Sequence, residues 1–406
     1  MSDVGPVLPR RIAHFDLDAF FVAVERVKDP SLRRRPVLVG HRGRRGVVAT
    51  ASYEARAFGC RSAQPMVQAL RLCPQAIVVP PDFAAYLDVS RRFHAMLGEL
   101  TPIVESGGID EAYADLTGIG PDGMGGRAAA EALRARVREE LGVVVSACIA
   151  GSRTAAKVGS DRAKPDGLIE VPAGEDESFL APSPMRDLPF VGPKFAQALA
   201  RAGIRTVGEA AAQDPRWLVA QFGASGAMLA DRARGIDLAP VRAGGRERKQ
   251  ISREVTFGED VTDLGQLRAV LREHAERVGS DLRARGKRAR TVTLKLRWQD
   301  FTTLSRSQTL ERPAQATSAI LDAAAALLDE VVRVEEFHPV RLIGLGVTNL
   351  VEDVVQLELL AAVSGAPAVG RGDTRRQEQI DRVLDALRER YGENSVGRGA
   401  SNLPKP

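Results

Sequence analysis

The sequence predicts a multidomain α+β protein, because three stretches of the chain differ in character. Residues 1–175 mix apolar strands with amphipathic helices, residues 188–240 are alanine-rich and helical, and residues 251–352 return to alternating strands with helices between them. A chain of 406 residues is long enough for roughly two to four domains. The charged, glycine-containing segment VRAGGRERKQ lacks an apolar pattern and is predicted to link the second stretch to the third.

The first stretch opens with a strand and a helix. Residues 12–17 (IAHFDL) are mostly apolar and predict a buried strand. Asp18 follows, and because aspartate is a good N-cap residue it is expected to begin a helix at Ala19. Further strands are predicted at 36–39 and 47–51, on either side of the polar turn HRGRRG.

The rest of the first stretch continues this mixture. In chain order we expect a helix at 84–98, a hairpin of strands 103–105 and 111–116, a helix at 126–140, a strand at 143–149 and a helix at 154–163. Gly107 and Gly108 form the turn of the hairpin, since adjacent glycines favour tight turns. The stretch is therefore predicted to be mixed α/β.

The third stretch contains the clearest alternation in the chain, TVTLKLRW at 291–298. One face of this predicted strand is apolar. Its polar face carries Thr293, Lys295 and Arg297. Residues 341–347 alternate similarly, with a helix predicted at 314–332 between the two strands. We therefore expect a small α+β domain with a basic sheet face, followed by a tail that contains a helix at 375–391.

Charge and composition point to a nucleic-acid partner. The net charge is only +5, but residues 242–312 hold 17 Lys or Arg against 10 Asp or Glu. Such a local excess favours a polyanion, most simply nucleic acid. Cys60, Cys73 and Cys148 are scattered without metal-ligand spacing, as in a reduced cytosolic protein. The sequence shows no secretory leader and no apolar run of membrane-spanning length, so a cytoplasmic location is expected.

Two carboxylate motifs lie far apart in the sequence. The first predicted strand ends in Asp16-Leu17-Asp18, and the predicted hairpin carries Asp110-Glu111. Carboxylates at the end of one strand and on a neighbouring hairpin suit two-metal phosphoryl transfer. Mg²⁺ prefers oxygen ligands, and two ions can bind the attacking and the leaving oxygen. Taken alone, the hairpin pair is better interpreted as a solvated turn.

The two carboxylate motifs belong to a set of four that occur in one order: FDLDAFFVAVE, ATASYEARAFGCRSAQPM, GIDEAYADLTG and AKPDG. With them the chain resembles the Y-family DNA polymerases, in particular the DinB or DNA polymerase IV branch, from about Ile12 to Glu352. A later stretch, LDALRERYG, is similar to tails in that branch. The resemblance implies a template-directed DNA polymerase of low fidelity and without proofreading, which extends primers with dNTPs in translesion synthesis and DNA repair.

The resemblance also implies a right-hand fold. Its parts would be a ferredoxin-like palm, small fingers, a helical helix-hairpin-helix thumb and an α+β little finger. The implied boundaries are 1–25 and 82–175 for the palm, 26–81 for the fingers, 176–242 for the thumb, 243–250 for a linker, 251–352 for the little finger and 353–406 for a tail. The implied partners are primer-template DNA and dNTP. The protein is expected to be a monomer.

In the implied palm, Asp16, Asp110 and Glu111 are the catalytic carboxylates and hold two Mg²⁺ ions, for which Mn²⁺ can substitute. The carbonyl of Leu17 is an implied further ligand. Asp18 is interpreted as a helix cap in preference to a ligand.

The same motifs imply the nucleotide contacts. Tyr53 and Arg56 would reach the β- and γ-phosphates of the triphosphate, and Lys164 would join them to offset the charge that builds on the leaving group. A half-buried tyrosine with a surface arginine is the alternative for the first two. Phe21 matches the position whose ring leaves no room for a 2′-hydroxyl, with Phe20 beside it in the nucleotide site. Adjacent helix positions cannot both face one core direction, so one ring is expected in the core, and that role stays open for Phe21.

Two regions are expected to hold DNA. The segment at 188–201 is similar to a helix-hairpin-helix, in which Gly192 joins two helices tightly and backbone N–H groups, with Lys194, face a phosphate. Pro193 removes one such donor, and an ordinary helical turn is the alternative. The phosphate contacts implied in the little finger are Lys249, Arg253, Lys295 and Arg297. Without the polymerase motifs, an alternating charged face would indicate only a solvated surface.

The tail contains QLELL, which resembles the peptide that docks bacterial polymerases onto the sliding clamp. The implied clamp-binding residues are Gln356, Leu357, Leu359 and Leu360. The glutamine would enter a polar subsite and the leucines an apolar pocket. Short patterns of this kind arise often by chance, and the alternative is that the leucines close the core of the preceding domain.

Two departures from the family pattern concern DNA contacts. Gly108 stands where a serine usually precedes IDE, and Ala150, Ser152 and Arg153 differ from a common Ser-x-Asn-Lys run. These departures leave the implied metal ligands intact. Two rival functions remain: a nucleotide cyclase, which also places carboxylates under a triphosphate, and a catalytically inert DNA-binding paralogue.

Overall fold

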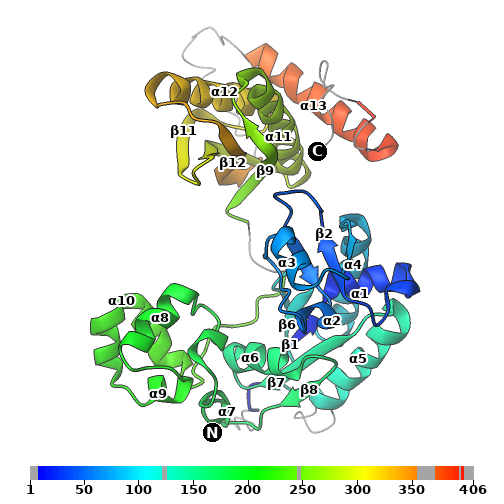
Figure 1. Cartoon of the computed structure of the whole chain (residues 1–406), viewed down its shortest axis with the longest axis vertical. Coiled ribbons are helices and arrows are strands. Elements are labelled where there is room, and N and C mark those ends of the chain that lie inside the picture. The colour runs from blue at the N-terminus through cyan, green and yellow to red at the C-terminus, as the bar shows by residue number, and fades with distance from the viewer. Residues whose placement is uncertain (1–7, 121–125, 245–247, 354–370, 393–394, 397–406) are drawn as a thin grey trace, which may run out of the picture. The chain divides into compact units, whose positions relative to one another are not determined.

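The computed structural model describes residues 8–120, 126–244, 248–353, 371–392 and 395–396. Contacts between residues divide the chain into two compact units, one ending at residue 246 and the other beginning at residue 247. Figure 1 shows the elements of both units. Among the described helices, none combines the length and the apolar character needed to cross a membrane.

A five-stranded sheet forms the centre of the first unit. Its strand order is β5 (Val104–Ser106), β6 (Glu111–Asp115), β1 (Ile12–Leu17), β7 (Val145–Ala150) and β8 (Leu168–Glu170). β1 lies in the middle and pairs antiparallel with both β6 and β7. Every residue of β1 and β7 is buried, as expected for strands covered on both faces.

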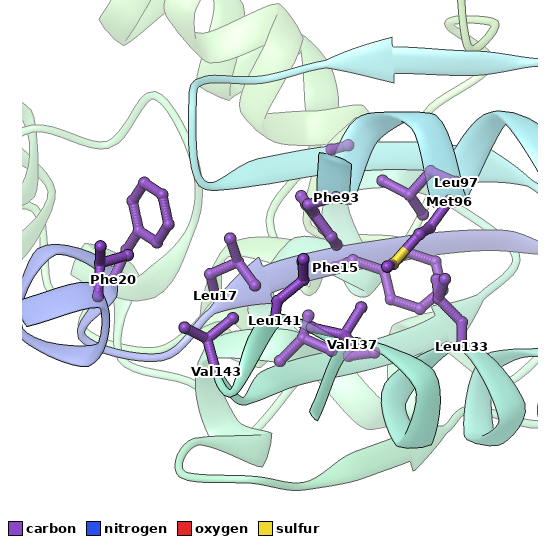
Figure 2. Close-up of a cluster of buried hydrophobic side chains, with 14 of the residues drawn as sticks. Phe15, Leu17, Phe20, Phe93, Met96, Leu97, Leu133, Val137, Leu141 and Val143 are labelled. Carbon is purple, nitrogen blue, oxygen red and sulfur yellow. The ribbon is translucent and has the colours of Figure 1, made fainter. Parts of the chain in front are cut away.

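Helices cover both faces of this sheet. The helices on one face are α1 (Phe20–Lys28), α4 (Phe83–Leu100) and α5 (Gly126–Leu141), and α6 (Arg153–Ala163) covers the other. Figure 2 shows the core under the first group, in which Phe15 of β1 meets Phe93 of α4 and Leu133 of α5. Because side chains alternate along a strand, Asp16 points away from this core and toward α6.

A smaller sheet with its own core follows α1. Its elements are β3 (Val48–Ala51), β2 (Val37–Gly40) and β4 (Ile77–Val79), in that strand order, with η1 (Pro30–Leu32), α2 (Tyr53–Arg56) and α3 (Met66–Leu72). Leu38 and Met66 are fully buried in this second core. The hydroxyl of Ser52 accepts a hydrogen bond from the backbone N–H of Ala55 and so caps α2, which fixes Tyr53 on its first turn.

Short helices make up residues 176–232. They are α7 (Asp176–Leu180), η2 (Met185–Asp187), α8 (Pro193–Arg201), α9 (Val207–Ala211) and α10 (Pro215–Arg232). Thr206 and Glu209 form a capping box that starts α9. α10 is kinked at Gly223, where φ is 59°. The apolar side chains of these helices share one core with α6 and its side of the large sheet.

The second unit is a four-stranded antiparallel sheet covered on one face. Its strand order is β11 (Thr303–Ala314), β10 (Lys287–Trp298), β12 (Val340–Glu352) and β9 (Gln250–Val261). The covering helices are α11 (Leu264–Ala284) and α12 (Thr317–Val334). No described element of this unit lies over the opposite face, which we call the uncovered face.

A last helix, α13 (Arg371–Tyr391), packs against α11 and α12. Ion pairs fasten it there. Asp381 Oδ2 lies 3.3 Å from Arg283 Nη1, and Asp385 Oδ2 lies 2.6 Å from Arg283 Nε. The Arg283 side chain is only 6% exposed, so these are buried contacts. The predicted tail thus contains a helix that belongs to the fold of the second unit.

The predicted elements of the first unit are present within two residues of their expected ends, but the structure corrects two predictions. Asp18 does not cap a helix. The N-cap of α1 is Ala19, which adopts the left-handed conformation with φ of 44° and makes no side-chain capping bond. In the second unit, residues 303–314 form β11, so α12 begins at Thr317 and not at residue 314.

Candidate active site

The two carboxylate motifs lie next to each other at one end of the large sheet. The register of β1 and β6 places Asp16 directly opposite Glu111. The backbone N–H of Leu17 donates to the carbonyl oxygen of Asp110 at 2.9 Å, which extends the pairing past the end of β6. Residues directly opposite each other in a sheet share a face. The carboxylates of Asp16 and Glu111 therefore project side by side toward α6.

Two lysines offset this negative charge. Lys157 Nζ lies 2.6 Å from Glu111 Oε2 and 3.3 Å from Asp16 Oδ2. Lys164 Nζ lies 2.8 Å from Asp16 Oδ2 and 2.8 Å from Asp161 Oδ1. Burial opposes the charge of Lys157, but the surrounding carboxylates, Asp161 first, outweigh it and raise the pKa of the lysine. The site is a compact network of carboxylate and ammonium groups.

Asp110 lies at the turn beside these groups. Burial raises the pKa of its carboxyl group, and repulsion from Asp16 and Glu111 raises it further. Gly108 lies two positions before it, and a Cβ added there would lie 3.3 Å from Asp110 Oδ1, which is a tight contact. Three carboxyl groups close enough to repel one another form a site that a cation would stabilise.

Asp18 belongs to the scaffold of the site. Its carboxylate accepts hydrogen bonds from Ser146 Oγ at 2.8 Å, from the backbone N–H of Asp166 at 2.7 Å and from the Tyr53 hydroxyl at 3.3 Å. Burial raises the pKa of Asp18 although these bonds oppose it. The bonds join β1 to β7, to the segment after α6 and to α2. Asp18 thus holds together the elements that carry the other candidate residues.

The donor set suits a hard divalent cation. Asp16, Asp110 and Glu111 offer only carboxylate oxygens, which magnesium-type ions prefer. Within the described residues, no three acidic, histidine or cysteine side chains already converge in metal-binding geometry. Two of the carboxylates point to lysine ammonium groups instead. The residues therefore fit a divalent ion by their chemistry, and binding one requires these side chains to rearrange.

Tyr53 and Arg56 stand together on α2. Arg56 Nε donates to the carbonyl oxygen of Ala51 at 3.0 Å, and its guanidinium lies 4.8 Å over the Tyr53 ring. Desolvation, followed by the charge of Asp18, raises the pKa of Tyr53, so its hydroxyl remains a proton donor. The hydrogen bond to Asp18 connects this pair to the end of β1.

Phe20 and Phe21 differ in environment. Phe20 is 2% exposed and enters the main core, whereas Phe21 is half-buried. The Phe21 ring stacks on Tyr86, with ring centres 4.3 Å apart and planes 11° from parallel. Tyr86 is itself fixed, because its hydroxyl donates to Glu25 at 2.6 Å. As expected, one of the two phenylalanines lies fully in the core, and the other is held from behind by a buried tyrosine.

Lys157 was not among the residues expected from sequence. The available signal was its spacing along α6, where charged residues three and four positions apart share one face. The residues of that stripe are Arg153, Lys157, Asp161 and Lys164. The structure shows that this face of the helix meets the carboxylate end of the sheet.

Arg153 has a structural role that its departure from the family pattern did not suggest. It forms a buried ion pair with Glu105 of β5, whose Oε1 lies 3.0 Å from Arg153 Nη2. Its guanidinium lies 4.2 Å over the Tyr113 ring. Glu105 also accepts a hydrogen bond from the backbone N–H of Arg242 at 2.9 Å. The segment that leaves the first unit is therefore fastened to the large sheet.

Comparisons with known proteins identify the family. The family described as impB/mucB/samB matches residues 15–161, and its C-terminal domain matches residues 248–359. A DNA polymerase IV of Dehalococcoides mccartyi strain CBDB1 is 41% identical over 393 residues, which cover 96% of this chain and 97% of that protein. A solved Y-family polymerase chimera of Dbh and Dpo4 superposes with a TM-score of 0.76 at 25% identity, covering 84% of this chain and 99% of the chimera. This chain belongs to the Y-family DNA polymerases.

A second relative and a second structure agree with this assignment. A DNA polymerase IV of Streptomyces coelicolor is 43% identical over 357 residues, which cover 87% of this chain and 74% of that protein. An insertion ternary complex of Dbh DNA polymerase is 25% identical, with a TM-score of 0.62 over 84% of this chain and 99% of that one. The predicted Y-family identity, the right-hand polymerase fold and the assignment as a DNA-directed DNA polymerase are confirmed.

In the thumb of this Y-family polymerase, Gly192 is the N-cap of α8 and Pro193 is its first residue. The φ of Gly192 is −74°, which any residue can adopt, and a Cβ there would touch no atom within 4 Å. Gly192 therefore adopts a backbone conformation that does not require glycine. The unusual backbone lies at Phe190, with φ of 69°, and at Gly203, with φ of 83°. Lys194 is exposed on the first turn of α8.

In the little finger, Lys295 and Arg297 lie on the uncovered face, as the alternation of TVTLKLRW predicts. Lys295 Nζ is 2.8 Å from Glu254 Oε2 on β9. Arg297 Nε donates to Thr303 Oγ1 on β11 at 2.9 Å. Both cations are therefore held by neighbouring strands of the same sheet.

Arg253 is placed differently from this pair. Its partner across the sheet is Leu345, a core residue, and its guanidinium binds Asp281 of α11. Arg253 therefore faces the helices and not the uncovered face. Lys249 is exposed just before β9. The predicted clamp-binding residues Gln356, Leu357, Leu359 and Leu360 lie outside the described residues.

Proposed function

We infer that this Y-family polymerase extends primers along a DNA template with dNTPs, at low fidelity and without proofreading, in translesion synthesis and DNA repair. One observation carries this inference: Asp16 and Glu111 lie side by side next to Asp110, in a chain similar along nearly its whole length to DNA polymerase IV. A ternary complex is recorded for the neighbouring Dbh polymerase. Primer-template DNA and an incoming dNTP are accordingly the substrates proposed for this chain.

Two Mg²⁺ ions, for which Mn²⁺ can substitute, are the proposed cofactors. Asp16, Asp110, Glu111 and the carbonyl of Leu17 would hold them. When bound, such ions activate the primer 3′-hydroxyl and offset the charge on the leaving pyrophosphate. The support in this chain is the all-oxygen donor set and the clustering of its carboxyl groups, where burial, and then repulsion from Asp16 and Glu111, raises the pKa of Asp110.

Lys164, Tyr53 and Arg56 are proposed to bind the triphosphate. Lys164 lies beside the carboxylates, 2.8 Å from Asp16, so its ammonium is next to the proposed metal site. Tyr53 keeps its proton and can donate a hydrogen bond. Arg56 engages Ala51 through Nε, an arrangement that orients the guanidinium for charge-assisted bonds from its terminal nitrogens.

Phe21 is the proposed sugar gate, with Phe20 forming the wall behind it. A gate must resist displacement, and the Phe21 ring is supported by its stack on Tyr86. A 2′-hydroxyl over this ring would overlap it, because the buried tyrosine leaves no room for the ring to retreat. Deoxyribonucleotides are therefore favoured by shape.

Duplex DNA is proposed to lie against the thumb and the little finger. In the thumb, the open space above Gly192 lets a phosphate approach the backbone N–H groups of α8, with Lys194 adding charge. In the little finger, Lys295 and Arg297 of the uncovered face and the exposed Lys249 are the proposed contacts. Arg253, which binds Asp281, is proposed to support the edge strand β9.

The domain boundaries proposed are those predicted from the resemblance, with one change. They are 1–25 and 82–175 for the palm, 26–81 for the fingers, 176–242 for the thumb, 243–250 for the linker and 251–352 for the little finger. The ion pairs of Asp381 and Asp385 with Arg283 add α13 to the little finger.

Gln356, Leu357, Leu359 and Leu360 are proposed to dock on the sliding clamp. They follow directly on the last strand of the little finger, where a short peptide can extend from the domain. Tethering to a ring around the duplex would raise the effective concentration of the polymerase without any new contact in its active site. A cytoplasmic monomer is the proposed form of the enzyme.

Primer extension by the purified chain tests the proposal. We expect extension that requires Mg²⁺, dNTPs and a template, and its loss in Asp110→Asn. Asp115→Asn is the matched control, since it makes the same change on β6 at a carboxylate that binds the backbone N–H of Thr117. Turnover of ATP without a primer would favour the cyclase. DNA binding with no synthesis would favour the inert paralogue.

A further inference from the structure

Lys157 holds a position that the proposed function leaves without a role. It projects from α6 and touches two proposed metal ligands at once, with Nζ 2.6 Å from Glu111 Oε2 and 3.3 Å from Asp16 Oδ2. Lys157 also lies 3.7 Å from Asp161 Oδ2. Lys164 contacts Asp16 and Asp161 but not Glu111 in the contacts of the described residues, and it is assigned to the triphosphate. Lys157 is the residue whose ammonium occupies the space between the carboxylates.

His14 is a second neighbour of Glu111, at a longer distance. His14 is fully buried on β1, with Nε2 3.7 Å from Glu111 Oε2 and Nδ1 2.7 Å from Ser160 Oγ. The 3.7 Å separation is too long for a hydrogen bond, whereas Lys157 Nζ lies 2.6 Å from the same oxygen. Among the contacts of the described residues, Lys157 is thus the cation in direct contact with Glu111.

Two carboxylates placed directly opposite each other on neighbouring strands destabilise a sheet. Here the Asp16 side chain is only 9% exposed, so solvent screens the repulsion poorly. We propose that Lys157 is the built-in counter-ion of the metal site: it holds Asp16 and Glu111 together in the metal-free enzyme and competes with the divalent ion for Glu111. This inference rests on the proposed metal site and adds a residue that positions its ligands.

The proposal separates Lys157 from a lysine that only stabilises the fold. A purely structural ion pair contributes the same stability with and without a divalent ion. A counter-ion is needed only until the ion arrives, because the ion then neutralises the same carboxylates. Removing it should therefore weaken the metal-free protein and strengthen metal binding, two effects of opposite sign from one substitution.

The test uses the full chain and Mn²⁺ alone, followed by the electron paramagnetic resonance signal of the free ion and by thermal melting. Lys157→Gln should melt about 2–4 °C below wild type in EDTA. It should bind Mn²⁺ about threefold to tenfold more tightly, and the melting difference should close at saturating Mn²⁺. The matched control is Lys28→Gln. Lys28 also bridges two carboxylates, at 3.1 Å from Glu25 and 2.7 Å from Asp82, outside the site, and its loss should leave Mn²⁺ affinity unchanged.

Equal Mn²⁺ affinity in wild type and Lys157→Gln, with a melting difference that persists at saturating Mn²⁺, would overturn the proposal. Asp110→Asn in the same titration tests the site itself. If it binds Mn²⁺ as wild type does, the proposed metal site is wrong. If it loses binding while Lys157→Gln behaves as wild type, the metal site stands and only the counter-ion role fails.

Discussion

Charge is concentrated at the carboxylate end of the palm sheet and diluted on the uncovered face of the little-finger sheet. In the palm, Asp16 and Glu111 are forced side by side by strand register, and ammonium groups from α6 offset them. The pKa of Asp110 is raised because burial and like charges both oppose its ionisation. The palm therefore gathers charges where they are unfavourable without a cation.

The little-finger face does the opposite. Its central strand contributes Gly344 and Gly346, and a Cβ added at Gly344 would lie 3.0 Å from the Cβ of Glu254. Beside the glycines, Thr293 and Ser307 share a hydrogen bond at 2.8 Å between their hydroxyls. Small residues between the charged side chains of this face would allow a DNA backbone to approach closely without selecting a sequence.

The difference reflects the separate physical requirements of phosphoryl transfer and of duplex binding. Phosphoryl transfer needs positive charge, here from metal ions, at the reacting phosphate. The carboxylates that bind those ions must therefore be held close together although they repel one another. Gripping a duplex needs many weak contacts that tolerate any sequence, so a single charge matters little. Substitutions in the palm should accordingly have far larger effects than substitutions on the little-finger face.

The largest effect is expected for Asp16→Asn. Loss of a metal ligand removes several kcal/mol of transition-state stabilisation, so primer extension should fall by about 1000-fold or more. Duplex affinity should stay near the wild-type value, because Asp16 contacts lysines and not the proposed DNA surface. Asp88→Asn, which removes an exposed carboxylate paired with Arg91, should extend normally. Single-turnover extension by Asp16→Asn within tenfold of wild type would refute its role as a ligand.

The next effect concerns the stability of the little finger. Asp381→Asn combined with Asp385→Asn leaves the buried guanidinium of Arg283 without a carboxylate, and breaking a buried pair costs about 3–5 kcal/mol. Urea unfolding of the second unit should show the loss. Asp329→Asn is the control, because its pair with Arg268 is exposed and should contribute at most about 1 kcal/mol. An equal loss of unfolding free energy in the double variant and in Asp329→Asn would mean that α13 does not stabilise the second unit.

A smaller effect is expected at the sugar gate. Phe21→Ala removes the ring that excludes a 2′-hydroxyl, and relief of an overlap worth about 1–3 kcal/mol should raise ribonucleotide use relative to deoxyribonucleotide use by about 10-fold to 100-fold. Phe83→Ala is the control, since this exposed ring packs edge-on against Phe21 at 5.8 Å without being the proposed gate. Ratios of kcat/KM for paired nucleotides measure the change. An unaltered ratio would make Phe21 a core residue.

The sequence predicted the elements of the first unit closely, because each carries a local signal of its own. β1 is an apolar run, and α6 has a helical charge pattern. What failed was the interpretation of residues whose partners are distant. Asp18 was predicted to be a cap from its propensity alone, but its carboxylate binds Ser146 and Asp166, 128 and 148 positions away. Lys157 was missed for the same reason, since its partners lie 46 and 141 positions away.

Charge counting along the chain had a related weakness. The excess of positive charge in residues 242–312 is partly offset by residues 313–406, which hold 14 Asp or Glu against 10 Lys or Arg. The ion pairs of Arg283 with α13 show this compensation in space. Residues 26–61 of the first unit also hold a positive excess, with 10 Lys or Arg against 2 Asp or Glu. The net charge of a stretch of sequence therefore does not give the net charge of a surface, because folding brings distant charges together.

The smallest expected effect is on DNA binding by the little finger. It distinguishes the two faces of one sheet. Lys295 lies on the uncovered face, and Arg253 lies on the helix-covered face, yet both are basic residues held by one carboxylate. If duplex DNA rests on the uncovered face, Lys295→Gln should weaken binding slightly and lower the slope of log affinity against log salt by about 1. Arg253→Gln should leave that slope unchanged, since its charge is directed at Asp281.

Fluorescence anisotropy of a labelled duplex across a range of salt concentrations measures both slopes. Either substitution alone could alter affinity by loosening a strand. The salt slope is the more specific measure, because it depends on how many phosphates the protein neutralises. Equal slopes for Lys295→Gln and wild type would mean that this lysine only balances Glu254 across the sheet. A lower slope for Arg253→Gln alone would place the DNA along the edge of β9, and the glycines of the uncovered face would then need another explanation.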